Sequence, residues 1–116
     1  MQYLALIYGN EKEEMARGEE WNFALIEQYR AFGAWLEASG IKADGEALQP
    51  TTTATTVRVR DGKTLTTDGP FAETKEQLGG YYLIEAKDLD QAILVASKIP
   101  SAAYGCVEVR PIMTFE

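Results

Sequence analysis

Short apolar runs alternate with longer amphipathic stretches along this chain, and the alternation predicts its secondary structure. The segment Gln2–Tyr8 is almost continuously apolar and ends at Gly9-Asn10, so we predict a central strand covered on both faces. After an acidic stretch, the next segment predicts a long helix that ends at Gly40. The apolar stripe of this helix consists of Leu25, Tyr29, Phe32 and Leu36.

The middle of the chain predicts a β-hairpin. Lys42–Pro50 has no apolar periodicity and is expected to be a loop. Thr55–Arg60 then alternates between valine and polar residues, as a half-buried strand does. Asp61-Gly62 is a strong hairpin turn signal, and Lys63–Thr67 is the returning strand.

The second half predicts another strand, helix and strand. Tyr81–Ala86 is apolar and follows Gly79-Gly80, whereas Asp88 has the position of a helix N-cap. The helix after Asp88 has an apolar stripe, and Cys106–Ile112 alternates again as a strand. The stripe consists of Leu89, Ala92, Ile93 and Ala96.

The order of these elements predicts one domain over residues 1–116, an α+β fold of the ferredoxin-like βαββαβ type with an added hairpin strand. Two helices cover only one face of a sheet. We expect one set of residues to meet the helices: Val57, Val59, Val107 and Val109. The opposite face would carry Arg58, Arg60, Glu108 and Arg110. Covering that face by a second sheet predicts a homodimer with a partly polar cavity between the sheets.

Charge and composition exclude several classes of function. The formal net charge is −7 and the basic residues are not clustered, so we expect neither nucleic acid nor an anionic membrane as partner. The sequence contains no histidine, which excludes Cys/His zinc sites, Ser-His-Asp triads and Cys-His chemistry. Nothing in the sequence indicates a cofactor.

The remaining compositional features concern location. No apolar run approaches the roughly 20 residues that a membrane span needs, and the N-terminus has no secretory signal pattern. A single cysteine cannot form an internal disulfide, so the protein is expected to be cytoplasmic. That residue, Cys106, lies within a predicted strand and is expected to pack rather than to react. Trp21 and Trp35 belong to the first helix and are expected in the core or an interface.

The segment from Thr67 to Gly80, TDGPFAETKEQLGG, contains the densest group of candidate functional residues. Asp68 leaves a strand, Gly69-Pro70 forces a turn, and Thr74 with Gln77 has the spacing of a helix-capping box. A loop held by a rigid sheet is a common place for function. The alternative is that Asp68 forms an Asx turn and the neighbouring side chains are simply solvated. Those neighbours are Glu73, Lys75 and Glu76.

The run DGPFAETKE, followed by LGGYYLIEA and DLDQA, resembles the YCII-related, or DGPF-domain, family of small bacterial proteins. The segments LALIYGN, ATTVR and VEVRPI extend the resemblance over nearly the whole chain. The resemblance implies a dimeric α+β barrel of ferredoxin-like subunits. It also implies a possible regulatory setting, because some relatives are fused to, or encoded beside, extracytoplasmic-function sigma factors.

The resemblance further implies a candidate catalytic residue. Members of the wider family carry a His-Asp pair suggested to be catalytic, and Asp68 matches its aspartate. This chain has no histidine, and an aspartate with an ordinary pKa near 3.9 is a weak base at neutral pH. One hypothesis is therefore an enzyme that uses Asp68 as general acid or base.

A second hypothesis is a binding module for a small polar or anionic ligand, held in the cavity between two sheets. Arg58 and Arg110 would bind the ligand by paired hydrogen bonds, or they pair instead with Glu108 or with the partner subunit. The further ligand-binding candidates are Tyr8, Glu73, Lys75 and Glu108. Asp68, Glu73 and Glu76 lack the spacing of a known cation loop, so we expect no metal site. A third hypothesis is a purely structural or protein-interaction domain.

Overall fold

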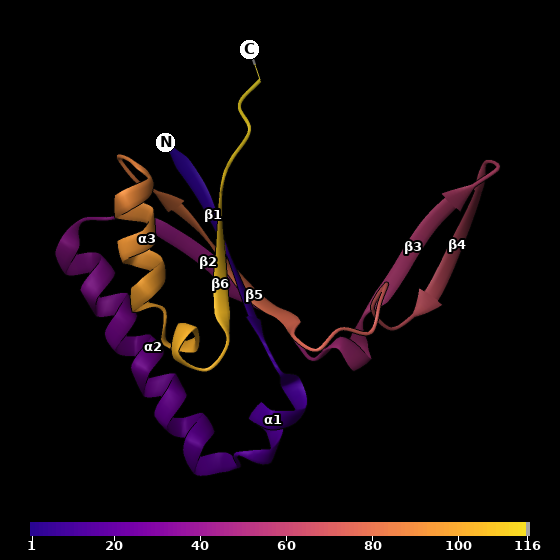
Figure 1. Cartoon of the computed structure of the whole chain (residues 1–116), viewed down its shortest axis with the longest axis horizontal. Coiled ribbons are helices and arrows are strands. Elements are labelled where there is room, and N and C mark those ends of the chain that lie inside the picture. The colour runs from indigo at the N-terminus through magenta and orange to yellow at the C-terminus, as the bar shows by residue number, and fades with distance from the viewer. Residues whose placement is uncertain (116) are drawn as a thin grey trace.

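A computed structural model describes residues 1–115 as a four-stranded antiparallel sheet with helices on one face and a separate hairpin (Figure 1). The sheet contains β1 (Gln2–Gly9), β2 (Ala43–Ala47), β5 (Gln77–Glu85) and β6 (Cys106–Pro111). The hairpin contains β3 (Thr55–Arg60) and β4 (Lys63–Asp68). The α-helices are α1 (Glu11–Ala16), α2 (Glu19–Ser39) and α3 (Leu89–Lys98). Two 3₁₀ turns follow β2 and α3, namely η1 (Thr51–Thr53) and η2 (Pro100–Ala103).

The strand order confirms the predicted fold class. The sheet has the order β2-β5-β1-β6, and every neighbouring pair is antiparallel. With α1 and α2 between β1 and β2, and α3 between β5 and β6, this is the βαββαβ arrangement. The hairpin is inserted between β2 and β5, and its two strands form a sheet of their own. None of the helices described is long and apolar enough to cross a membrane.

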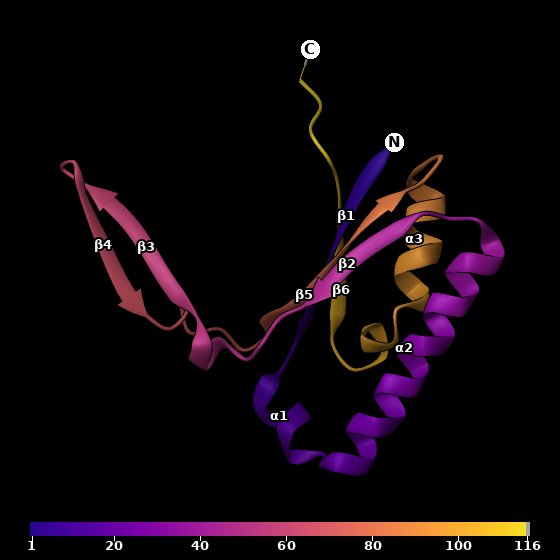
Figure 2. The same cartoon turned by 180° about the vertical axis from the view of Figure 1, so that it is seen from behind.

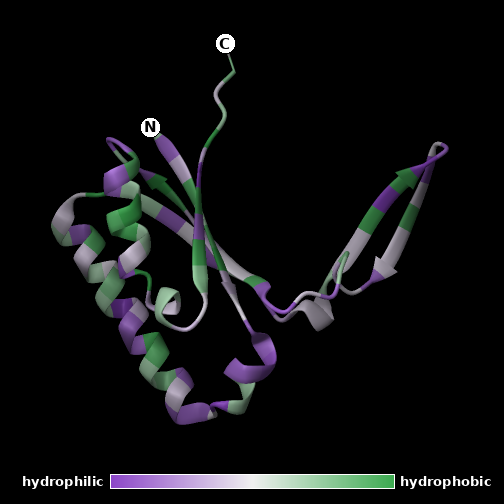
Figure 3. Ribbon diagram, viewed as in Figure 1, coloured by the Kyte–Doolittle hydropathy of each residue, from purple (hydrophilic) through white to green (hydrophobic). Residues whose placement is uncertain are grey.

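The core lies between the sheet and the long helices. Alternate residues of β1, beginning with Tyr3, are buried and form one core cluster with residues of β5, α2 and α3. Figure 3 shows that hydrophobic positions occur both along the sheet and on the helices beside it. The largest fully buried side chains are Ile84, Val95 and Ile99. The other residues of β1 are only half-buried, so one face of this strand is covered within the chain and not both. Two helices reach only one side of the sheet.

The prediction of a loop over Lys42–Pro50 is wrong for most of these residues, because the chain forms the edge strand β2 there. An edge strand pairs on one side only, and β2 is mostly exposed, so its sequence lacks the apolar alternation that predicts a strand. Gly45 is required where β2 meets β5, since a Cβ at this position would lie 1.9 Å from the Tyr81 carbonyl oxygen.

The β3–β4 hairpin is predicted correctly, but its place in the fold is not. The turn at Asp61 and Gly62 has positive φ angles of 52° and 73°, which is the geometry that tight hairpins favour. Val57 and Val59 were expected to meet the helices and are instead 59% and 60% exposed. Alternation shows which residues share a face of a strand, but not which element covers that face. The same prediction for Val107 and Val109 is confirmed, as both pack against the core.

The segment Thr67–Gly80, which we call the DGPF segment, forms no helical turn. Instead the Gln77 side-chain amide donates to the Thr74 carbonyl oxygen at 2.6 Å, and Gln77 begins β5. A bulge opposite Tyr8 then lets β5 continue through Gly79 and Gly80, so this strand begins earlier than predicted. The predicted cap of α3 is confirmed, since the Asp88 carboxylate accepts from the Gln91 N–H at 2.9 Å.

Candidate functional site

One face of the main sheet has no helix on it, and it carries three of the predicted site residues. The pairing register places Leu4 beside Leu83 and Arg110, and Leu6 beside Tyr81 and Glu108. Tyr8 lies in the next row of this face, beside Leu78 and Cys106. We call this surface the open face. Its residues are Leu4, Leu6, Tyr8, Asp44, Glu46, Leu78, Tyr81, Leu83, Cys106, Glu108 and Arg110. Cys106 is exposed on it, so the expectation that this thiol packs is wrong within one chain.

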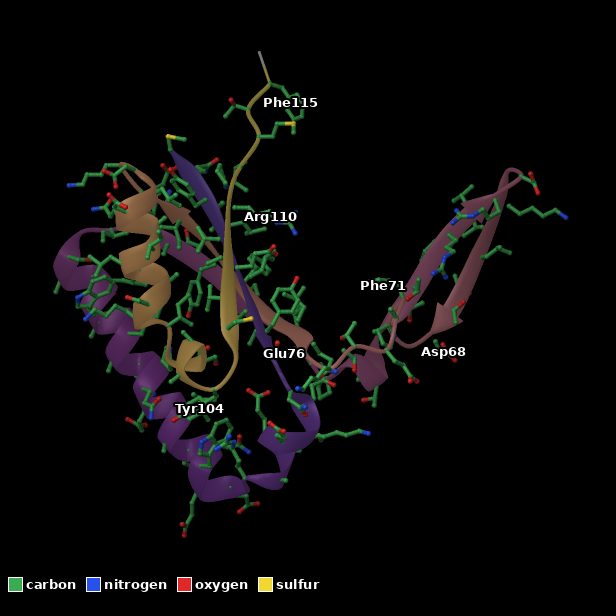
Figure 4. The ribbon with its side chains drawn as sticks, in the orientation of Figure 1. Asp68, Phe71, Glu76, Tyr104, Arg110 and Phe115 are labelled. Carbon is green, nitrogen blue, oxygen red and sulfur yellow. The ribbon has the colours of Figure 1, made fainter. Side chains whose placement is uncertain are left out.

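The two arginines expected to bind an anion do not meet within one chain. Arg110 points from β6 toward the side on which the hairpin stands, and its guanidinium pairs with the Glu108 carboxylate at 3.1 Å (Figure 4). This contact is the alternative that the sequence left open for Arg110. Arg58 lies on β3, outside the main sheet. Within one chain the two arginines therefore belong to different sheets.

The Asp68 side chain lies at the base of the hairpin and is exposed (Figure 4). The backbone closes the base: the Gly69 N–H donates to the Ala54 carbonyl oxygen at 2.7 Å, and the Thr56 hydroxyl donates to the Gly69 carbonyl oxygen. No hydrogen bond uses the Asp68 carboxylate within residues 1–115, so an Asx turn does not account for this residue. Glu76 lies nearer the sheet than Asp68 does.

The other charged residues of the DGPF segment are also exposed, among them Glu73 and Lys75. Within the described part of the chain, no three potential metal ligands among aspartates, glutamates and cysteine come together. The loop therefore presents its charged groups to solvent rather than enclosing a site.

The structure contains a pocket that the sequence did not predict, on the helix side of the sheet. Its volume is about 520 Å³, which is within the usual range for small-molecule sites. It lies where the N-terminal half of α2 and the short α1 meet the ends of β1, β2 and β5. Its lining includes four aromatic and three acidic residues: Tyr8, Trp21, Tyr29, Tyr82, Glu11, Glu14 and Glu46. Glu46 pairs with Tyr81, so the register places its side chain on the open face. Tyr8 is the one predicted site residue that lines it.

A hydrogen bond between α2 and η2 fixes the aromatic side of the pocket. The Tyr29 and Ser101 hydroxyl oxygens are 2.6 Å apart, which ties α2 to η2. Burial raises the pKa of Tyr29, and burial likewise raises the pKa of Tyr82. Both phenols are therefore neutral at ordinary pH and serve as hydrogen-bonding groups with apolar rings. Trp21, which was expected in the core or an interface, contributes its ring to this pocket instead.

The acidic side contains one carboxylate with a structural role and one that faces Gly9. Glu11 accepts from the Thr51 N–H at 2.9 Å and from the Thr51 hydroxyl at 2.8 Å, which fixes α1 against η1. The Glu14 carboxylate lies against Gly9, where a Cβ would come within 2.9 Å of its Oε1. Burial raises the pKa of Glu14, and the nearby Arg17 acts in the opposite direction.

No lysine or arginine is among the residues that line the pocket, so its charge is negative. Outside the lining, the Arg17 guanidinium lies 5.1 Å from the ring centre of Trp21 and 5.3 Å from that of Tyr104. Sequence reasoning missed the pocket because its lining comes from six separate elements. The local signals, Asn10 as the N-cap of α1 and a tryptophan near the start of α2, indicate helices and not a cavity.

Comparison with known proteins supports the family resemblance. The model of the YCII-related domain matches residues 1–116. A protein of Rhizobium meliloti (strain 1021), described as uncharacterised, is 36% identical over 118 residues, covering 100% of this chain and 95% of that protein. The whole length is thus matched by the family that the DGPF segment suggested. The chain belongs to the YCII-related family.

Proposed function

We propose that this protein is a homodimeric binding module for a small organic molecule, and that the ligand occupies the pocket between α2 and the sheet. The observation that carries the proposal is the 520 Å³ pocket, which combines aromatic walls with carboxylates. Ligand sites of this size usually have apolar walls and a few placed polar groups. A sensing role of this kind would suit the sigma-factor setting that the family resemblance suggests.

The charges of the pocket favour a neutral or cationic ligand. Glu14 contributes negative charge, and the rings of Trp21, Tyr29 and Tyr82 offer faces that attract cations. This differs from the anionic ligand expected from Arg58 and Arg110, because neither arginine lines the pocket. An organic amine with an apolar part fits this pocket, because its ammonium group can meet the carboxylate and its apolar part can pack against the rings.

The test is a thermal-shift and tryptophan-fluorescence screen with matched panels of organic amines and carboxylates. We expect amines to raise the melting temperature and to change the tryptophan emission, to which Trp21 contributes from within the pocket. Glu14→Gln should weaken amine binding by roughly 10-fold or more, because it removes a partly desolvated charge partner. Glu27→Gln is the matched control, since this exposed residue pairs with Arg30 outside the pocket. Preferential binding of carboxylates, or equal effects of the two variants, would contradict the proposal.

The homodimer is proposed from the open face. Leu4, Leu6, Tyr81 and Leu83 leave apolar surface half-covered on a sheet that has no second layer. Packing two open faces would bury them and would enclose Glu108 and Arg110 between the sheets. An anionic ligand in such a cavity would compete with Glu108 for Arg110, which makes this the second location for a site. Leu6→Asp should convert the dimer to a monomer in sedimentation velocity, whereas Lys12→Asp on exposed α1 should not.

One observation favours the enzyme alternative. The Asp68 carboxylate is exposed and takes no part in closing its own turn, so it is accessible to a substrate. Asp68→Asn keeps the shape of this side chain and removes its charge. If Asp68 is a general acid or base, the variant should lose turnover of any substrate found while retaining its melting temperature. Loss of stability without a specific loss of turnover would show a structural role instead.

A further inference from the structure

The β3–β4 hairpin stands away from the rest of the molecule, on the side of the open face (Figures 1 and 2). Its strands pair only with each other, and no helix covers either of its faces. A two-stranded hairpin alone in water is marginally stable at best. The hairpin therefore lacks, within one chain, the packing that normally stabilises such a structure.

The two faces of the hairpin differ in chemistry. The register places Val57 opposite Thr66 and Val59 opposite Thr64, which gives a face of β-branched side chains with one carboxylate, Asp68, at its base. We call this the valine face. The other face carries three basic side chains and one leucine: Arg58, Arg60, Lys63 and Leu65. The hairpin is therefore amphipathic, with its two valines on the face opposite the basic side chains.

The exposed surface of the chain is larger than a compact monomer needs. The accessible area is 8457 Å², whereas a compact protein of 12.8 kDa exposes about 6300 Å². The radius of gyration is 16.3 Å, against about 13 Å for a compact chain of this length. The surplus of about 2000 Å² per chain corresponds to about 4000 Å² for two chains. That area falls in the range of obligate homodimer interfaces.

The charge distribution indicates which partner fits. The hairpin (residues 55–68) has three basic residues and two aspartates, a net charge of +1, while the chain as a whole has a net charge of −7. The residues outside the hairpin are therefore even more acidic than the whole chain. The hairpin of one copy would be attracted to the body of another copy.

We propose that the β3–β4 hairpin is an arm that clasps a second copy of this chain, with its valine face packed on the partner. The proposal rests on the homodimer proposed above and extends its interface beyond the open faces. A second copy fits better than an unrelated protein for three reasons. The arm lies on the side of the open face, the surplus area matches an obligate dimer, and the basic arm complements an acidic body.

The first experiment removes the arm. The hydrogen bond from the Gly69 N–H to the Ala54 carbonyl oxygen brings the ends of residues 55–68 together, so two glycines can replace this segment. Neither the core nor the pocket uses a residue of the segment. We expect a folded protein by circular dichroism whose dimer dissociation constant is raised at least about 100-fold in sedimentation equilibrium. An unchanged dissociation constant would overturn the proposal.

A milder pair of variants tests the valine face with the arm in place. V57T/V59T keeps β-branched side chains and removes two apolar groups, and each change occurs twice in a symmetric dimer. We expect the dissociation constant to rise by roughly 10-fold or more. The control is R58T/R60T on the basic face, which should change mainly the salt dependence of association. A larger effect of the control than of V57T/V59T would reject the valine face as the contact.

A photo-crosslinking residue at position 57 identifies the occupant. In a mixture of ¹⁵N-labelled and unlabelled chains, we expect crosslinked peptides that contain one chain of each kind. Crosslinks within a single chain, or to other proteins of a lysate in preference to this chain, would overturn the proposal. If removal of the arm leaves the dimer intact and Leu6→Asp abolishes it, the open-face dimer stands and the arm proposal fails. A wild-type monomer would overturn both.

Discussion

The two faces of the main sheet are built from the same strands and have opposite surroundings. On the helix face, Ala5 and Ile84 are completely buried beneath α2 and α3. On the open face, their neighbours Leu6 and Leu83 remain half-exposed. The chain thus completes one layer of packing from its own residues and leaves the other incomplete. The difference separates residues that the fold needs from residues available for contacts with other molecules.

The largest expected loss of stability comes from truncating a buried side chain on the helix face of the sheet. Ile84→Ala should lower the free energy of unfolding by about 3 to 4 kcal/mol, because it leaves a cavity among fully buried side chains. Leu83→Ala, one residue away on the open face, should cost less than about 1.5 kcal/mol in the isolated chain. Urea denaturation at low protein concentration measures both. Similar losses would show that the two faces are equally packed in the monomer.

A smaller effect is expected at the boundary between the packed core and the pocket. Tyr29→Phe removes the hydroxyl that contacts Ser101 and leaves the ring in place. The free energy of unfolding should fall by about 1 kcal/mol, the usual value for one hydrogen bond. Ser101→Ala should cost a similar amount, and the double variant little more, because both singles remove the same bond. Additive losses in thermal or urea denaturation would show that the two hydroxyls act independently.

The smallest effect concerns pH. Because burial raises the pKa of Glu14, the folded state binds its proton more tightly than the unfolded state does. The contribution of Glu14 is therefore most favourable below the ordinary pKa of 4.5 and is lost as the pH rises through the raised value. Glu14→Gln should be slightly more stable than the wild type at pH 7, and the difference should shrink toward pH 4. A difference that grows on acidification would contradict this assignment.

The parts of the fold that sequence patterns predicted are those determined by local chemistry. The cap at Asp88, the turn at Asp61-Gly62 and the stop at Gly40 depend on a few adjacent residues and are all confirmed. The β2 strand was missed because an exposed edge strand needs no apolar alternation. The position of the hairpin was also wrong, because Val57 and Val59 look the same whether a helix or a second molecule covers them.

The candidate site was less predictable than the fold. Sequence reasoning placed ligand binding on Arg58 and Arg110, which the chain holds apart, and it included only Tyr8 of the pocket lining. The pocket depends on the bulge in β5, on the bond between Tyr29 and Ser101, and on the close approach of Glu14 to Gly9. Each of these relates residues that are not adjacent in sequence. A pattern read along the chain contains no signal for them.

The hydrogen bond between the Gly69 N–H and the Ala54 carbonyl oxygen brings together the two ends of the segment that forms the hairpin. Segments of this kind can change in length and sequence without moving any residue of the core. If the hairpin decides which copies associate, a genome that encodes several such proteins can keep their subunits from mixing by altering this segment alone. Substitutions that separate paralogues would then concentrate between Ala54 and Gly69. Substitutions in the pocket would accumulate independently of them.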